Sequence, residues 1–359
     1  MVLLDFAKAF DRVPHHLLIY KLRYYGIDPD VLGWITSFLY NRTQEVIVDG
    51  EASSKSSVDS GVPQGSVLGP LLFLLYINDL PAYPRNNSTT RLFADDSVIY
   101  RQIDSEADAA LLQEDLDRLL DWEKDWGMTF HPSKCQVISV TKKRKIVNFD
   151  YMMKGHILEK VESVKYLGVT IDKGGSWNNH INNVTASSHK TLSFLQRNLS
   201  QCPMSIKELS YKSLVRSKVE YATTIWDPHT KSNIDKLEMI QRKGARFVCG
   251  DFRRYSSVTE MLQRLQWESL QARRKACKLV MMYKTVNNLI DLSSANFNLQ
   301  QSPLHPHKFI QPFTRTDCYK FSFVPSAVRL WNGLPASVAQ APTIGIFRPA
   351  MQAVVYQIY

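Results

Sequence analysis

Arg91–Tyr100 (RLFADDSVIY) is the stretch that decides the fold, because two short β-prone runs are joined there by two turn-favouring residues, Asp95 and Asp96. This pattern predicts a β-hairpin with both carboxylates at its tip. The apolar run Val2–Leu4 predicts a buried strand that ends at Asp5. If the two strands are neighbours in one sheet, Asp5 converges with Asp95 at one edge of that sheet.

A cluster of carboxylates at such an edge is costly unless divalent cations neutralise it, and hard oxygen ligands suit Mg²⁺. Two such ions could activate an attacking hydroxyl and stabilise a leaving phosphate oxygen, which is the two-metal scheme for nucleotidyl transfer. An isolated Asp-Asp pair is also ordinary turn chemistry. The wider sequence must therefore decide between the two interpretations.

The first half of the chain alternates strand and helix signals. Helical spacing predicts helices over Leu17–Tyr25, Val31–Leu39 and Leu68–Leu80, and Asp49–Gly50 predicts a hairpin turn. Ser105 with Asp108 gives a capping-box signal for a long amphipathic helix that continues to Trp126. We expect an α+β fold with helices packed on an antiparallel sheet.

Helical spacing dominates after Trp177. It predicts helices at about residues 178–199, 204–219, 231–248, 257–264 and 267–288. Beyond Leu292 the chain is rich in proline and the periodicity fades, which predicts an irregular C-terminal tail.

Composition narrows the function classes. The 359 residues are 44% hydrophobic and 22% charged, which argues against disordered, collagen-like or coiled-coil architectures. The longest apolar run, Val67–Ile77, falls short of the roughly 20 residues of a membrane span. Five scattered cysteines indicate free thiols in a reducing compartment.

The net charge of +10 is unevenly distributed, with −8 over residues 1–140 and +18 over residues 141–359. The basic half predicts a surface that binds a polyanion, although ordinary solvated helix faces would give the same composition.

Five segments carry a further resemblance because they occur together in one order over about 170 residues. They are Leu3–Asp11 (LLDFAKAFD), Ser60–Pro70 (SGVPQGSVLGP), Phe93–Asp96 (FADD), Gly127–Cys135 (GMTFHPSKC) and Tyr166–Val169 (YLGV). They resemble motifs A, B, C and D of reverse transcriptases and the hairpin that grips the primer. The residues within these segments are similar to those of the polymerases of non-LTR (LINE, jockey-like) retrotransposons. The similarity continues sparsely through Ser176–Asn178 (SWN), Phe323–Pro325 (FVP) and Arg329–Pro335 (RLWNGLP).

The resemblance implies an RNA-directed DNA polymerase that binds two Mg²⁺ ions. Asp5 and Asp95 would be metal ligands and catalytic residues, with Asp96 a supporting carboxylate. Lys134 would protonate the departing pyrophosphate. A structural role as an exposed lysine fits this position equally well. Asp11 fits a helix cap or an ion pair better than a metal ligand.

The same resemblance implies the nucleotide-binding and primer-binding residues. The carbonyl of Phe6 would face a metal, and the ring of Phe10 would exclude a 2′-hydroxyl, although a core aromatic is the alternative for Phe10. Gln64 and Gly65 would contact the incoming nucleotide and the template. Tyr166, Leu167 and Gly168 would form the primer grip.

At the level of domains, the resemblance implies a palm over residues 1–175, a basic helical thumb over 176–290 and a Pro-rich tail over 291–359. The partners would be template RNA, a DNA primer and deoxynucleoside triphosphates, with no membrane, in an intracellular location with access to the nucleus. Since the sequence starts just before motif A, we expect the fingers and endonuclease segments of the parent element to be missing and activity to be weak or absent.

Two other functions stay open. A non-catalytic remnant of a retroelement would bind nucleic acid through its basic half alone. The second is a palm polymerase related to group II intron maturases or telomerase, although the residues of motif A and of the tail argue against it.

Overall fold

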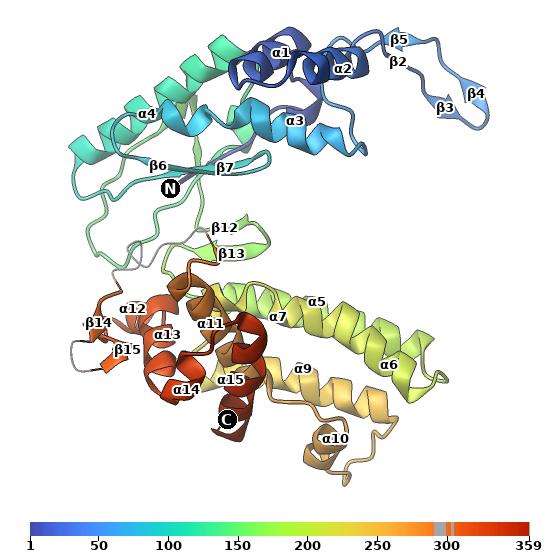
Figure 1. The fold of residues 1–359 in the computed structure, drawn as a ribbon, viewed down its shortest axis with the longest axis vertical. Helices are drawn as coiled ribbons and strands as arrows, with labels where there is room; N and C mark the ends of the chain where they lie inside the picture. Colours follow the sequence, from blue (N-terminus) through green and yellow to red (C-terminus); the bar gives the residue numbers. More distant parts are fainter. Residues whose placement is uncertain (291–298, 303–304, 359) are drawn as a thin grey trace. The chain divides into compact units, whose positions relative to one another are not determined.

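The computed structural model describes residues 1–290, 299–302 and 305–358. It divides into two compact units, unit 1 (Met1–Gly168 with Asp172–Gly174) and unit 2 (Val169–Ile171 with Gly175–Tyr359). The chain passes from one unit to the other within the hairpin of β12 (Ser163–Tyr166) and β13 (Val169–Asp172) (Figure 1). Helices and sheets are both present, as the expected α+β class requires.

A five-stranded sheet is the centre of unit 1. Its order is β11 (Glu159–Lys160), β8 (Gln136–Val137), β1 (Val2–Leu4), β7 (Asp96–Tyr100) and β6 (Thr89–Phe93). All neighbours are antiparallel except β11 and β8. The prediction that the first strand lies beside the hairpin is therefore confirmed, because β1 pairs directly with β7.

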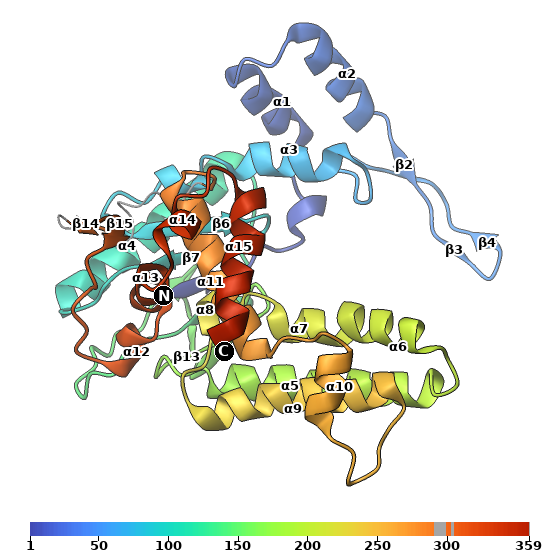
Figure 2. The ribbon, with the colours of Figure 1, turned by 60° about the horizontal axis from the view of Figure 1, so that its bottom comes forward.

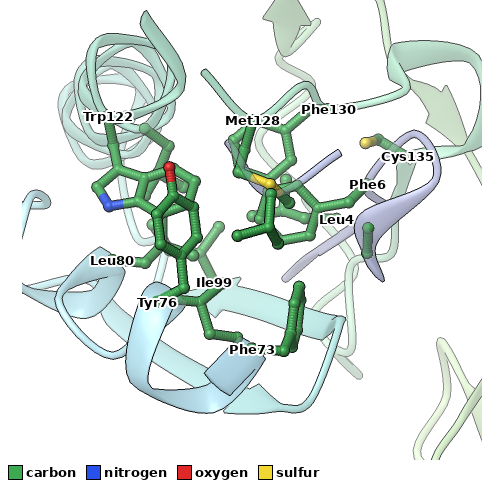
Figure 3. Close-up of a cluster of buried hydrophobic side chains, with 14 of the residues drawn as sticks. Leu4, Phe6, Phe73, Tyr76, Leu80, Ile99, Trp122, Met128, Phe130 and Cys135 are labelled. Atoms are coloured by element: carbon green, nitrogen blue, oxygen red, sulfur yellow. The ribbon is translucent and has the colours of Figure 1, made fainter. Parts of the chain in front are cut away.

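Helices α3 and α4 cover one face of this sheet (Figure 1). Apolar side chains from both helices and from β1 and β7 form one core, in which Phe73, Tyr76 and Trp122 are fully buried (Figure 3). The capping box of Ser105 and Asp108 starts α4 as predicted. The helical elements of unit 1 are η1 (Ala9–Asp11), α1 (His15–Tyr24), α2 (Pro29–Leu39), α3 (Leu68–Ile77), η2 (Leu80–Ala82), α4 (Glu106–Trp126) and η3 (Pro132–Lys134).

A narrow two-stranded arm extends from the end of α2 and returns to α3 (Figure 2). It consists of two short ladders, β2 (Thr43–Gln44) with β5 (Ser56–Ser57) and β3 (Ile47–Val48) with β4 (Glu51–Ala52). Asp49 and Gly50 form its tip, both with positive φ, as the turn prediction requires. A third small ribbon of unit 1 pairs β9 (Met152–Met153) with β10 (His156–Ile157).

Unit 2 is predominantly helical, and the predicted helices are confirmed to within three residues at each end. They are α5 (Asn178–Asn198), α6 (Met204–Tyr211), α7 (Ser217–Glu220), α8 (Thr223–Trp226), α9 (Lys231–Cys249), α10 (Val258–Arg264) and α11 (Leu270–Val286). A π-helical turn, η4 (Lys212–Arg216), joins α6 to α7, so the predicted helix at 204–219 is continuous but widened in the middle. Across the described ranges, no helix is both long and apolar enough to cross a bilayer.

The prediction of an irregular C-terminal tail is wrong for most of its length. Its described residues form four helices and a small ribbon: α12 (Asp317–Lys320), α13 (Phe323–Asn332), α14 (Ala336–Ala339), α15 (Ile344–Ile358), and β14 (Gln301–Ser302) paired with β15 (His305–Phe309). The prolines misled the prediction because Pro325 lies in the first turn of α13 and Pro335 is the N-cap of α14, where a missing N–H costs nothing. Residues 291–298 and 303–304 of the predicted tail lie outside the described residues.

Candidate active site

The hairpin tip differs from its prediction by one residue. Phe93 pairs with Asp96, so the loop consists of Ala94 and Asp95, and Asp96 is the first residue of β7. Ala94 adopts the left-handed conformation, with φ of 52°, which closes a two-residue loop in the twist of the flanking strands. Asp95 therefore lies in the loop and Asp96 lies on the strand.

Asp5 lies beside these carboxylates. Leu4 pairs with Ser97, the residue after Asp96, and Asp5 directly follows Leu4, so Asp5 and Asp96 lie at the same end of the sheet. The pKa of the Asp96 carboxyl is raised by burial first, then by the negative charges of Asp95 and Asp5. Asp95 and Asp5 thus repel the Asp96 carboxylate at one end of the sheet, where the side chain of Asp5 is 46% exposed.

A cation would relieve this repulsion, and carboxylate oxygens are the donors that hard divalent ions prefer. Within the described residues, however, no three His, Cys, Asp or Glu side chains are gathered into a ready-made metal site. The donor chemistry and the charge at this edge fit a divalent ion. Asp5, Asp95 and Asp96 would hold it only after their side chains draw closer together.

The segment before β8 fixes the backbone at Asp5. The Asp5 carbonyl accepts from the His131 N–H at 2.8 Å, and the Asp5 N–H donates to Cys135 Sγ at 3.5 Å. Phe6 stacks on Phe130 with ring centroids 4.4 Å apart, which buries the Phe6 side chain in the core (Figure 3). The same segment carries Lys134, whose Nζ lies 4.0 Å from Asp5 Oδ1.

The loop that precedes α3, from Ser60 to Val67, lies against the turn that follows β1. The Val62 N–H donates to the Phe10 carbonyl at 2.8 Å, and Gln64 Nε2 donates to Asp11 Oδ1 at 2.9 Å. Gly61 has φ of +92°, and a Cβ there would lie 2.9 Å from backbone atoms of Asp11. Only glycine permits this close crossing of the two loops.

Phe10 and Gly65 occupy different surroundings. The ring of Phe10 stacks on Phe73 at 4.3 Å and is half-buried, so its position is fixed by the core. Gly65 has φ of +80°, and a Cβ there would have no atom within 4 Å. Its backbone therefore faces open space.

The predicted primer-grip residues lie at the turn of the β12–β13 hairpin. Tyr166 ends β12, and Leu167 and Gly168, with φ of 44° and 81°, form the turn. The pKa of the Tyr166 phenol is raised by burial first, and then by Asp96 and Tyr100. Tyr166 is therefore within electrostatic range of Asp96.

Comparison with known proteins identifies the family. Residues 1–171 match the family described as reverse transcriptase (RNA-dependent DNA polymerase). These residues are a reverse transcriptase domain.

The chain is also similar to RNA-directed DNA polymerases of Drosophila melanogaster mobile elements. It is 29% identical over 257 residues to that of jockey, 30% over 256 residues to the probable enzyme of the X-element, and 31% over 265 residues to that of transposon BS. Each match covers 69% of this chain and 28% of the relative. The chain is thus homologous to non-LTR retrotransposon polymerases and spans little more than a quarter of their length.

The reverse transcriptase domain brings one group of the predicted residues together. Asp5, Asp95 and Tyr166 lie within electrostatic range of Asp96, and Lys134 lies 4.0 Å from Asp5. Phe10, Gln64 and Gly65 follow along the adjoining loops, and only the side chain of Phe6 is withdrawn into the core. Reverse transcriptases generally use divalent metal ions, which agrees with the carboxylates at this edge.

Three residues that support the site were not predicted to do so. Cys135 contacts the Asp5 backbone, and burial raises the pKa of its thiol. Asp11 accepts from Gln64, in place of the expected cap or ion pair. The buried His15 ring is hydrogen-bonded through Nε2 to the Gly61 carbonyl at 2.8 Å. Their occurrence in or near the motif segments was the only available signal.

Proposed function

We propose that the reverse transcriptase domain catalyses RNA-directed DNA synthesis with two Mg²⁺ ions held by Asp5, Asp95 and Asp96. The observation that supports this most is the pairing of β1 with β7, which brings Asp5 to the end of the sheet where Asp95 and Asp96 lie. The substrates would be template RNA, a DNA primer and deoxynucleoside triphosphates. Synthesis primed on chromosomal DNA would place the protein in the nucleus.

Bound at these carboxylates, the ions would supply the Lewis acidity that lowers the barrier to phosphoryl transfer. The chain's own contribution begins with the backbone bonds at Asp5, which hold its carboxylate at the sheet edge. Lys134, 61% exposed and 4.0 Å from Asp5, is placed to donate a proton to the departing pyrophosphate.

Substrate positioning would fall to the neighbouring loops. The stacked Phe10 ring is rigid enough to discriminate against a 2′-hydroxyl, and the Phe6 carbonyl would face a metal. Gln64, oriented by Asp11, and Gly65, open on its outer side, would contact the nucleotide and the template. Tyr166, Leu167 and Gly168 would hold the primer end near Asp96.

In the same proposal, residues 1–175 are the palm, residues 176–290 are a thumb that holds the product duplex by its phosphates, and residues 291–359 follow as a C-terminal segment. The helical architecture of α5–α11 and the surplus of basic residues beyond residue 140 support a phosphate-binding role.

Primer extension tests the proposal. The 359-residue chain, given Mg²⁺, a primed RNA template and deoxynucleotides, should extend the primer slowly, and Asp95→Asn should abolish extension. Asp49→Asn is the matched control, because Asp49 is an exposed turn aspartate at the tip of the arm with φ of 52°, which asparagine tolerates. Extension that survives Asp95→Asn would overturn the proposal.

Cation binding gives a readout that does not depend on activity. Substituting Fe²⁺ for Mg²⁺ should direct radical cleavage of the backbone near Asp5 and Asp95, and Asp5→Asn with Asp95→Asn should remove the cuts. A chain that shows neither cleavage nor extension but binds RNA in a salt-dependent manner would instead be the non-catalytic nucleic-acid-binding remnant.

A further inference from the structure

A cavity of about 780 Å³ lies in unit 1 at the opposite end of β7 from Asp96. Its walls are Tyr100–Asp104, which end and follow β7, the segment between β8 and β9, and the end of β11. None of its lining residues belongs to the five motif segments. The volume is within the range of sites for small molecules, about 300–1,000 Å³.

The interior of the cavity is apolar. Phe149 and Tyr151 form a pair of rings with centroids 5.0 Å apart, and Tyr151 is 7% exposed. The aliphatic side chains of the lining are Ile103, Val137, Val140, Ile146, Val147 and Val161. Val140 and Ile146 are still 50% and 53% exposed. A ligand that covered these side chains would remove apolar surface from water.

One side of the cavity is a strap, residues 140–150, which contains neither helix nor strand. Near one end Lys143 pairs with Asp104, and at the other end Lys160 Nζ lies 2.5 Å from Asp150 Oδ1. Within the described residues, 144–147 make no hydrogen bond and no ion pair. Exposed ion pairs contribute little stability, so the middle of the strap can move aside at low cost to admit a ligand.

The strap is also basic. It carries four consecutive cations, Lys142–Lys145, of which Lys145 lines the cavity. In the described part of the chain Lys142, Arg144 and Lys145 have no carboxylate partner. Every other cation of the lining has one: Lys143 with Asp104, Lys160 with Asp150, Lys173 with Glu162 and Arg101 with Asp108. The surplus of positive charge is therefore confined to the middle of the strap, beside the apolar interior.

We propose that this cavity binds one molecule of an amphipathic carboxylate of the fatty-acid class, with the chain in the apolar interior and the head group at Lys145. Branched aliphatic walls suit a methylene chain, which brings no polar group that would need a partner there. A nucleic acid strand would satisfy the basic run but leave the apolar interior unused. An uncharged lipid would leave the surplus charge of the strap without a counter-charge. This binding needs no metal and does not depend on the proposed polymerase activity.

The fluorescent fatty acid cis-parinaric acid tests the proposal, because its emission rises when its chain enters apolar surroundings. Titrated into the full chain, it should saturate at one molecule per chain. Dodecanoate should displace it. Dodecyltrimethylammonium, which has a chain of the same length but a cationic head, should displace it about tenfold less well. Emission that rises without saturating would show adsorption to exposed apolar surface and would contradict the proposal.

Val140→Trp tests the cavity, because the larger side chain would occupy the space of the ligand from an exposed position without disturbing the core. Affinity for cis-parinaric acid should fall at least about tenfold. The matched control is Val31→Trp, on α2 outside the cavity, where the valine is 46% exposed. Thermal melting checks that both variants fold, and dodecanoate should raise the melting temperature of the control but not that of Val140→Trp.

Arg144→Gln with Lys145→Gln tests the charge and leaves the apolar lining intact. Affinity should fall about fivefold and lose its dependence on salt. Arg23→Gln with Lys55→Gln is the matched control, since both side chains are exposed and lie outside the cavity. Equal losses in the control variants, wild-type affinity in Val140→Trp, or equal displacement by the two dodecyl compounds would overturn the inference. Asp95→Asn should bind cis-parinaric acid as the wild type does, so failure of the proposed polymerase activity would be seen separately.

Discussion

Units 1 and 2 place their unbalanced charge in opposite environments. In unit 1, the charges of Asp5 and Asp95 repel the Asp96 carboxylate at the exposed end of a sheet, where Asp95 and Asp96 are on the surface. In unit 2, Arg274 and Lys278 are buried together and share one acid, Asp227, at 2.8 and 2.9 Å. Nη1 and Nη2 of Arg274 have no hydrogen-bond partner within the described residues.

The difference separates a binding role from a structural one. An exposed excess of negative charge can be neutralised by an ion or a substrate that comes and goes, so it suits a site. A buried excess of positive charge cannot be reached in this way, because the side chains of Arg274 and Lys278 are 1% and 5% exposed. The fold itself must stabilise these buried charges, so substituting their partner should lower the stability of the protein.

The largest effect is expected where the buried cations lose their shared acid. Asp227→Asn should reduce the free energy of unfolding by about 3–5 kcal/mol, because two buried cations are left without a counter-charge. Urea denaturation followed by circular dichroism measures the loss. Asp235→Asn, at an exposed position of α9, should change it by less than about 0.5 kcal/mol. A small loss in Asp227→Asn would remove the contrast between the two units.

The next effect concerns the crossing of two loops in unit 1. Gly61→Ala should cost about 2–4 kcal/mol, because a left-handed backbone and contact with Asp11 backbone atoms at 2.9 Å are both unfavourable for alanine. Gly65→Ala, with similar φ but open space, should cost only about 1–2 kcal/mol. Equal losses in thermal unfolding would show that the close crossing is not important.

The smallest effect concerns a buried cation of unit 1 whose surroundings are complete. Lys21 donates to the Tyr76 carbonyl and to Asp79, both at 2.5 Å, and lies 3.6 Å from the centroid of the Trp126 ring. Lys21→Met should therefore cost about 1 kcal/mol at pH 7. The cost of Lys21→Met is smaller than that of Asp227→Asn, because Asp79 is partly exposed and still accepts a hydrogen bond from Trp122.

The pH dependence of that cost follows from the pKa of Lys21, which burial lowers to about 8 against the opposing effect of Asp79. Between pH 8 and the ordinary lysine pKa of about 10.4, the unfolded chain binds a proton that the folded chain has released. The stability of the wild type relative to Lys21→Met should thus rise from pH 8 to pH 10. A difference that shrinks over this range in urea titrations would contradict the assignment.

The sequence predicts helices and strands better than it predicts the residues at their ends and in the turns between them. The pairing of the first strand with the hairpin and the cap at Ser105 follow from short-range patterns, and both are present. The position of the loop does not follow, because the left-handed conformation of Ala94 has no compositional signal. The helices of the tail were missed because proline in a first turn resembles proline in a loop.

The candidate site shows the same limit. The motif segments identify Asp5, Asp95 and Gln64, but not the contacts that orient them, since Cys135 and Asp11 act through tertiary structure.

The arm has a consequence for the timescales on which different parts of unit 1 open. Each of its ladders has only two residue pairs, and Val46, Ile47 and Val48 are 63–65% exposed, so little apolar burial stabilises it. A two-stranded ribbon of this kind is marginally stable in water. Its amide protons should therefore exchange with solvent far sooner than those of β1 and β7, and the ladder of Thr43 with Ser57 should open and close many times while the rest of the domain stays folded.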